Sequence, residues 1–303
     1  MNTADSEDGR RALSSLAAHE EFTAALEAST GTARPISFGN PMSPSDVLEG
    51  YHRLLLSPRP DRGLAVLART GVLASTLPEV AALIGFGDAV RHKDVWAHTL
   101  QVVRQTPARS GCRFGALFHD IGKVPTRRFA DNGEVTFLGH PEVGARMFDR
   151  IARRLPFPEP AKERIRFLIA AHLRASAWQP DWTDAAVRRF IRDAGPHLRD
   201  LLDLARADIT SKYDDRVRRG LRQINGLAVR IREVRAMDGK PRALPPGLGD
   251  TLMREFHIPP GPRLGRLMRT LCAEVEAGTL VPGADHRVYT DHLTRHPSLL
   301  ADA

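Results

Sequence analysis

The ten residues Phe114–Lys123, FGALFHDIGK, join an apolar segment to an adjacent histidine and aspartate. The apolar residues predict a buried helix, and His119 and Asp120 stand at its C-terminal end. Gly122 then allows the chain to turn away from the helix. A helix that ends in this way can present two metal ligands from one rigid element.

Four further candidate ligands lie on the segments around this one. They share a position among apolar residues, where an unpaired polar side chain is costly to bury. One histidine on a helix is more often a surface or core residue, so the hypothesis rests on the whole set. Imidazole nitrogens and carboxylate oxygens together suit divalent transition metals such as Mn, Fe, Co, Ni or Zn. The four residues are His98, His140, His172 and Asp208.

The rest of the chain predicts an all-α fold. Apolar residues recur at helical spacing from Ser45 onward, and short breaks rich in Gly and Pro separate the segments. Thr183 followed by Asp184 is an N-cap pattern that opens one helix. The one extended segment that we expect is Glu134–Leu138. Predicted strands do not alternate with predicted helices along the chain, so a parallel sheet is not expected.

Composition divides the chain into four parts. The first is rich in Ser, Thr, Glu and Ala and is expected to be a mobile tail with a short amphipathic helix near Ala12–Glu27. A cluster of Gly and Pro at Ala236–Gly249 predicts a linker before a final helical segment. The expected parts are residues 1–40, 41–90, 91–235 and 236–303.

The chain has 303 residues, of which 42% are hydrophobic and 26% charged, as is ordinary for a globular protein. Lys and Arg together number 44 against 36 Asp and Glu, a net charge of +8 that comes mostly from Arg. This excess can indicate a nucleic-acid or phosphate partner. The alternative is a genome of high GC content, which favours Arg, Ala, Gly and Pro whatever the function.

Nothing in the sequence predicts a membrane protein or a secreted one. No run approaches the ~20 apolar residues that a membrane span needs. The acidic start MNTADSEDGRR lacks the layout of a secretion signal. Two cysteines cannot form a disulfide framework. We therefore expect a cytoplasmic protein, and the sequence does not indicate its oligomeric state.

The candidate ligands occur along the chain in an order that is similar to that of a known family. His98, His119–Asp120 and Asp208 resemble the H…HD…D signature of the HD superfamily of metal-dependent phosphohydrolases. His140 and His172 look like the additional pair of its two-metal members. The resemblance implies a helical HD-domain bundle, here at residues 91–235, with flanking helical segments.

This chain resembles one branch of the superfamily more than the others. From about Asp46 to Leu280 the chain resembles the C-terminal half, body plus HD domain, of bacterial CCA-adding tRNA nucleotidyltransferases. The segments that carry the resemblance include HRLLLSPRPDRGLAVLARTGVL, LFHDIGK, GEVTFLGHPEVGARM and ARADITS. About 45 residues precede the helical region here, and they contain neither the Gly-Ser turn nor the paired carboxylates of a nucleotidyltransferase head. Nucleotide addition is therefore not the expected activity.

The resemblance also implies how the ligands divide between two divalent ions, which could be Mn, Fe, Co, Ni or Mg. Asp120 would bridge the two ions. One ion would be completed by three residues and the other by two. These are His98, His119 and Asp208 for the first ion, and His140 and His172 for the second.

Two further residues are assigned to the reaction beside Asp120, which is also expected to be catalytic. Lys123 would offset negative charge on a phosphoryl oxygen, although a solvent-facing lysine is the alternative. Arg128 follows the HD loop closely and would bind a substrate phosphate through its guanidinium fork.

The function that the resemblance implies is a phosphohydrolase. Its substrate would be a phosphomonoester or a cyclic phosphodiester of a nucleotide or an RNA end, with contact to tRNA. Two other classes stay open. One is an RNA- or tRNA-binding module without catalysis, and the other is an oxygenase that uses a diiron centre of the HD type.

Overall fold

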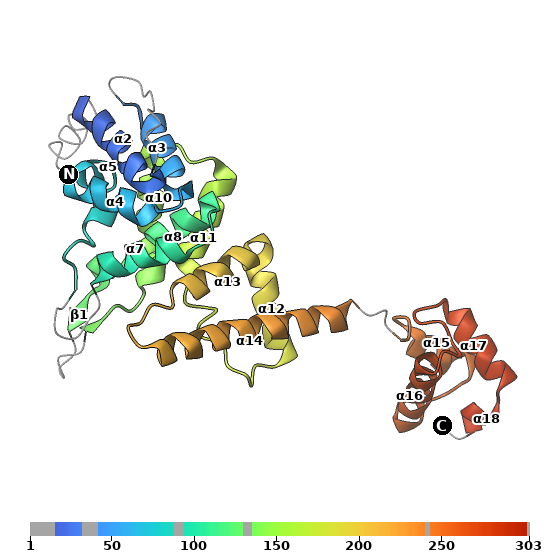
Figure 1. The fold of residues 1–303 in the computed structure, drawn as a ribbon. Helices are drawn as coiled ribbons and strands as arrows, with labels where there is room; N and C mark the ends of the chain where they lie inside the picture. The colour runs from blue at the N-terminus through green and yellow to red at the C-terminus, as the bar shows by residue number, and fades with distance from the viewer. Residues whose placement is uncertain (1–15, 32–41, 88–93, 130–134, 240–242, 302–303) are drawn as a thin grey trace. The chain divides into compact units, whose positions relative to one another are not determined.

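The computed structural model describes residues 16–31, 42–87, 94–129, 135–239 and 243–301. The regular secondary structure of these residues is helical apart from one short two-stranded sheet (Figure 1), and this confirms the all-α prediction. The chain divides into two compact units, Met1–Ile231 and Arg232–Ala303.

The first unit is built around α8 (Ser110–Phe118), which packs against α3, α7, α11 and α13. The side chains of Phe114, Leu117 and Phe118 are buried there, and Phe118 contacts Phe148 with ring centroids 5.4 Å apart. A central helix of this kind can deliver whatever follows it into the middle of the unit. The other helices of the unit are α2 (Leu16–Thr30), α3 (Pro44–Leu56), α4 (Pro60–Arg69), α5 (Val72–Thr76), α6 (Pro78–Ala81), α7 (Val95–Gln105), α9 (Lys123–Thr126), α10 (His140–Arg154), α11 (Glu159–Ala171), α12 (Asp184–Ala194), the 3-10 helix η1 (Gly195–His197), α13 (Leu198–Ala207) and the start of α14 (Asp214–Asp238).

Local signals explain where several helices begin. Ser43 and Asp46 form a capping box at the start of α3, each side chain accepting a hydrogen bond from the other residue's backbone N–H. The hydroxyl of Thr183 accepts a hydrogen bond from the N–H of Ala186, which confirms the predicted N-cap of α12. Such caps satisfy backbone donors that have no partner inside the helix.

Of the segment that we expected to be a mobile tail, residues 1–15 and 32–40 lie outside the described residues. Residues 16–31 overlap the short amphipathic helix that we expected near Ala12–Glu27. They form α2, whose Phe22 is fully buried and meets the Tyr51 ring edge-on at a centroid distance of 5.3 Å. The backbone of α2 approaches α4 closely at Gly63, where a Cβ atom would lie 2.6 Å from the Ala25 carbonyl oxygen. Composition could not show this, because the surface that covers α2 comes from other helices.

A small hairpin follows α9. β1 (Arg128–Phe129) pairs antiparallel with β2 (Val135–Thr136), with Arg128 opposite Thr136. β2 lies inside the extended segment predicted from the sequence. β1 was not expected, because two residues are too few to show a periodic pattern.

A buried arginine ties the central helix to its neighbours. Arg113 on α8 donates hydrogen bonds to the carbonyl of Leu55 and, at 2.7 Å, to that of Ser57, at the end of α3. It also donates to the Thr106 carbonyl at 2.9 Å, at the end of α7. Burial lowers the pKa of this guanidinium, and the three acceptors compensate part of that burial by pairing with three of its five N–H donors.

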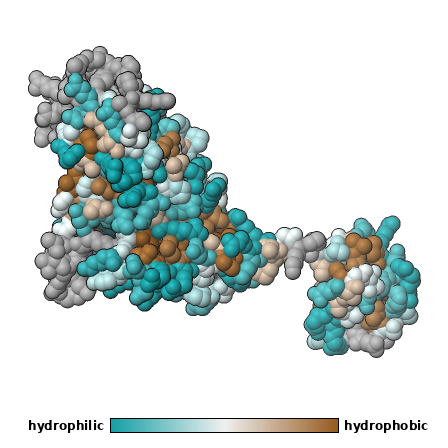
Figure 2. Space-filling view, in the orientation of Figure 1, coloured by the Kyte–Doolittle hydropathy of each residue, from teal (hydrophilic) through white to brown (hydrophobic). Residues whose placement is uncertain are grey.

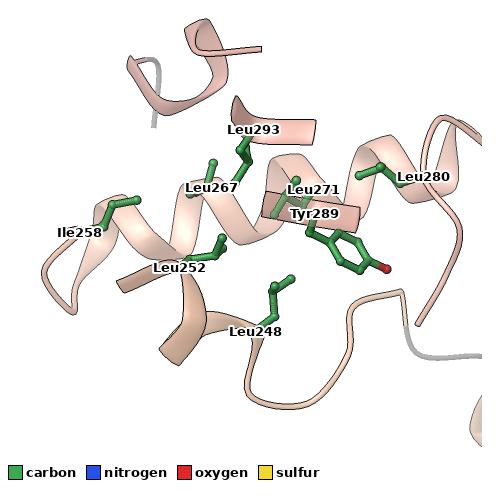
Figure 3. Close-up of a cluster of buried hydrophobic side chains, with 8 residues drawn as sticks. All are labelled: Leu248, Leu252, Ile258, Leu267, Leu271, Leu280, Tyr289 and Leu293. Atoms are coloured by element: carbon green, nitrogen blue, oxygen red, sulfur yellow. The ribbon is translucent and has the colours of Figure 1, made fainter. Parts of the chain in front are cut away.

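The second unit has a core of its own (Figure 3). The hydroxyl of Tyr289 lies 3.0 Å from the Ala243 carbonyl and 2.8 Å from the Val281 carbonyl, so its polar end is satisfied. The helices of this unit are α15 (Leu248–Glu255), α16 (Pro262–Glu276), α17 (His286–Arg295) and α18 (Ser298–Ala301). The core residues are Leu248, Leu252, Ile258, Leu267, Leu271, Leu280, Tyr289 and Leu293.

Hydrophilic residues cover most of the face shown in Figure 2, with hydrophobic residues gathered in patches between them. Within the described ranges, every helix is too short or too polar to cross a lipid bilayer.

The contact between α2 and α4 gives a first testable prediction. Gly63→Ala places a methyl group against the Ala25 carbonyl and the Leu54 side chain, so we expect the free energy of unfolding to fall by about 1–3 kcal/mol. Gly265→Ala in α16 is the control, because its Cβ would meet only Arg269 at 3.6 Å. Urea unfolding of both variants measures the difference. Equal stabilities for the two variants would contradict the close packing of α2.

Candidate metal centre

The chain turns sharply after α8, and this turn carries His119 and Asp120 into the interior, where both are fully buried. The Nδ1 atom of His119 lies 2.7 Å from the Ala116 carbonyl. A carbonyl oxygen can only accept, so Nδ1 carries the hydrogen and Nε2 faces the site.

Two more histidines are oriented in the same way. Nδ1 of His140 donates to the Phe137 carbonyl at 2.9 Å, and Nδ1 of His172 donates to the Ile169 carbonyl at 2.8 Å. In each case the acceptor lies three residues earlier in the chain. His140 is the first residue of α10, and His172 ends α11. Local backbone geometry therefore points both Nε2 atoms inward.

His98 on α7 depends on a side chain instead. Its Nδ1 atom lies 2.7 Å from the hydroxyl of Thr210, two residues beyond Asp208. The Oδ1 atom of Asp208, at the end of α13, lies 3.0 Å from His98 Nε2 and 3.5 Å from His119 Nε2. The sequence analysis did not identify Thr210 as part of the site, although it lies within the ARADITS segment.

Asp120 lies between the two pairs of histidines. Its Oδ2 atom is 3.2 Å from His119 Nε2 and 3.5 Å from His98 Nε2. Its Oδ1 atom is 3.5 Å from His140 Nε2 and 4.0 Å from His172 Nε2. The structure thus brings all six predicted ligand residues together in two groups of three. These are His98, His119 and Asp208, and Asp120, His140 and His172.

The Nε2 atoms within each pair face each other closely. They are 3.3 Å apart for His98 and His119, and 3.1 Å apart for His140 and His172. Two nitrogen lone pairs repel at this distance unless a proton or a cation lies between them. Burial lowers the pKa of His140, and burial together with the charge of His119 lowers the pKa of His172 to about 4. Both rings are therefore neutral at pH 7, and the second pair has no proton to share.

The carboxylates are held in their charged forms. Burial opposes ionisation of Asp120, but the charge of His119 and its hydrogen bond hold the pKa well below its usual range. Asp208 behaves likewise, through hydrogen bonds from His119 and His98. Burial would lower the pKa of His119, but Asp120 and Asp208 raise it to about 10. His119 is therefore protonated at pH 7 without an ion. A divalent ion requires ionised carboxylates and neutral imidazoles, so His119 would lose this proton when an ion binds.

The residues therefore fit divalent cations. Among the side chains that the structure describes, Asp120 Oδ1 is buried without a hydrogen-bond partner, beside two neutral imidazoles. A buried polar atom of this kind is costly unless something compensates it. A cation coordinated by Oδ1 and the two facing nitrogens would satisfy all three atoms.

Gly122 fixes the distance between the two halves of the site. A Cβ atom there would collide with the carbonyl of His140 and lie 2.7 Å from the backbone nitrogen of Gly144. The turn after Asp120 therefore lies directly against the first turn of α10. This close approach is the physical requirement behind the glycine of the HDIGK sequence.

The remaining predicted residues have different surroundings. Lys123 Nζ lies 2.6 Å from Asp120 Oδ2, and it lies 5.7 Å from the centre of the Phe137 ring. Arg128 is exposed on β1 and donates to the carbonyl of Arg127 at 2.9 Å. In the described part of the chain it makes no hydrogen bond or ion pair with the six clustered residues. Asp94 caps α7 by accepting from the N–H groups of Trp96 and Ala97.

The six clustered residues lie within a segment that matches a known family. A family model for the HD domain matches residues 95–213, which contain all six clustered residues. The chain contains an HD domain. The curated relatives extend the likeness beyond it, as expected from the resemblance to tRNA nucleotidyltransferases.

Three relatives illustrate this. The CC-adding tRNA nucleotidyltransferase of Thermus thermophilus is 36% identical over 243 residues, which are 77% of this chain and 54% of the relative. The A-adding tRNA nucleotidyltransferase of Deinococcus radiodurans is 34% identical over 239 residues, 76% of this chain and 54% of the relative. The multifunctional CCA protein of Vibrio parahaemolyticus is 29% identical over 179 residues, 56% of this chain and 43% of the relative. The HD-domain chain thus spans about half the length of the relatives it matches.

The contact between His98 and Thr210 gives a prediction about metal affinity. Thr210→Val removes the hydroxyl that orients His98, so we expect the affinity for Mn²⁺ to fall by about 10- to 100-fold. Thr210→Ser keeps the hydroxyl and should bind Mn²⁺ as the unaltered chain does. Thr270→Val, whose hydroxyl bonds within α16, is the control. Calorimetric titration with Mn²⁺ measures the affinities, and an unchanged Thr210→Val variant would contradict this role.

Proposed function

We propose that this HD-domain chain is a divalent-metal-dependent phosphohydrolase acting on the phosphate of a nucleotide or an RNA end. The observation that carries the proposal is the position of the Asp120 carboxylate between two groups of inward-facing ligand atoms. In this proposal the HD domain occupies residues 91–235 and follows a helical segment at 41–90, while residues 236–303 form a separate C-terminal segment.

The proposed ligand roles follow the two groups. His98, His119 and Asp208 would hold one divalent ion, His140 and His172 would hold another, and Asp120 would reach both. Bound ions of this kind turn water into a nucleophile near neutral pH and offset the charge of a phosphoryl group. Mn, Fe, Co, Ni and Mg are all compatible with nitrogen and oxygen donors.

Residues of this chain would also limit which substrates enter the site and would compensate the charge of the phosphate. Burial of the ligand rings restricts the site to groups that fit its open side, where Asp208 and Lys123 are partly exposed. The Lys123 ammonium would compensate negative charge on the phosphoryl oxygens as water adds to phosphorus and the ester oxygen leaves. Arg128 remains a candidate for a more distant substrate phosphate. Contact with tRNA is proposed because the relatives are tRNA nucleotidyltransferases.

The decisive experiment compares Asp120→Asn with the unaltered chain after each common divalent metal has been added. We expect release of phosphate from nucleoside 2′-, 3′- or 5′-monophosphates, or opening of nucleoside 2′,3′-cyclic phosphates. Asp120→Asn keeps the shape but loses the charge, and should reduce turnover by more than about 100-fold, since loss of a residue that merely orients a ligand costs up to about that much. Asp149→Asn, which alters an exposed ion pair with Arg166, is the control.

Other results would favour the other classes. Oxygen consumption with bound iron, and no phosphate release, would indicate an oxygenase. RNA binding that weakens steeply with salt and ignores His98→Ala would indicate a binding module. Absence of phosphate release with every metal and every substrate would refute the proposed hydrolase.

A further inference from the structure

Large apolar or aromatic side chains are exposed within five residues, along the chain, of three of the clustered residues. Leu138 is 86% exposed and lies two positions before His140. Leu173 is 46% exposed and directly follows His172. Because the ligand atoms converge within a few ångströms, the residues next to them in the chain lie around the same site. A single exposed leucine is ordinary, but several at the edge of one polar site mark a surface that could contact an apolar group.

Tyr213 is the third of these exposed side chains, and it is 52% exposed. It lies five residues after Asp208 and three after Thr210, whose hydroxyl contacts His98. Three residues span at most about 11 Å, so the Tyr213 backbone lies within that distance of the Thr210 backbone, whose side chain reaches His98.

The backbone of Tyr213 is fixed. Its N–H donates to the Ser211 hydroxyl at 3.1 Å. Its carbonyl accepts from the N–H groups of Arg216 and Val217, in the first turn of α14, at 3.1 and 3.2 Å. The ring therefore projects from a defined point at the start of a long helix. The chain's other tyrosines, Tyr51 and Tyr289, are buried and use their hydroxyls for internal hydrogen bonds.

Two cations accompany the exposed ring. Lys212 Nζ lies 5.3 Å and the Arg216 guanidinium carbon 4.9 Å from the ring centre. Neither forms an ion pair with a carboxylate of the described residues, whereas nearby Arg218 is paired with Asp215 at 2.6 Å. An exposed aromatic ring beside available positive charge suits a ligand that has both a planar base and phosphate groups.

We propose that Tyr213 is a specificity-determining residue, whose ring stacks on the base of a nucleotide while the attached phosphate occupies the metal centre. Lys212 and Arg216 lie over the ring, so their flexible side chains would move aside for the base and toward the sugar–phosphate part of the same ligand. The substrate class is a phosphate ester that carries its base next to the reacting phosphate, as against a small phosphate ester without a base. This inference rests on the proposed hydrolase function and names the group that the site selects.

The test compares adenosine 3′-monophosphate with glycerol 2-phosphate, which has no base. We expect Tyr213→Ala to lower the ratio of kcat/KM for the nucleotide to that for glycerol phosphate by about tenfold, mainly through KM. Tyr213→Phe retains the ring and should retain the ratio. Val281→Ala, a 65% exposed position in the second unit, is the control. An equal loss with both substrates, or no loss with either, would overturn the inference.

Binding separates this inference from the proposed hydrolase function. Calorimetric titration of the Mn²⁺-loaded chain with adenosine 3′-monophosphate needs no turnover. If neither substrate is hydrolysed but Tyr213→Ala still weakens nucleotide binding by about tenfold, the hydrolase proposal fails and the stacking role stands. If the unaltered chain hydrolyses both substrates and Tyr213→Ala binds the nucleotide normally, only the stacking role fails. Nucleotide binding that is absent from the unaltered chain would also refute it.

Discussion

Each oxygen of the Asp120 carboxylate faces imidazole nitrogens of two different histidines, at 3.2–3.5 Å on one side and 3.5–4.0 Å on the other. An ionised carboxylate is costly to bury, and here that cost is offset only if positive charge is shared among its neighbours. His119 and Lys123 supply such charge on one oxygen. The other oxygen faces two neutral rings, and this asymmetry is the reason that the site suits a cation.

The helices of the first unit are arranged so that this carboxylate can be surrounded. α8 lies at the centre, and the helices that pack on it end at or carry His98, His172 and Asp208. Gly122 allows α10 to come close enough for His140 to join them. Arg113 ties α8 to the ends of α3 and α7. The same packing of helices that forms the core therefore also sets the geometry of the polar site.

The surplus of positive charge has a more local meaning than the composition suggested. Several arginines are paired with carboxylates on neighbouring elements, as Arg154 is with Glu79 and Arg174 with Asp193. Paired surface charges contribute little to stability and do not mark a binding site. The cations at Tyr213 differ, because they lie over an exposed ring that follows Asp208 by five residues. The positions of individual cations are therefore more informative about function than their total number. The net charge of +8 does not distinguish a genomic bias from a phosphate partner.

The sequence by itself predicted the helical class and the six candidate ligand residues that the structure brings together. Periodic apolar residues and short Gly and Pro breaks predicted the helical class. The adjacent His119 and Asp120, together with polar residues on the surrounding apolar segments, predicted the candidate site. The four other ligand residues could be named because polar side chains on apolar segments are conspicuous. Tertiary structure alone decided the docking of α2, the strand β1 and the contact of Thr210 with His98. Each depends on a contact between residues distant in sequence or too few to form a pattern, so no local signal encodes it.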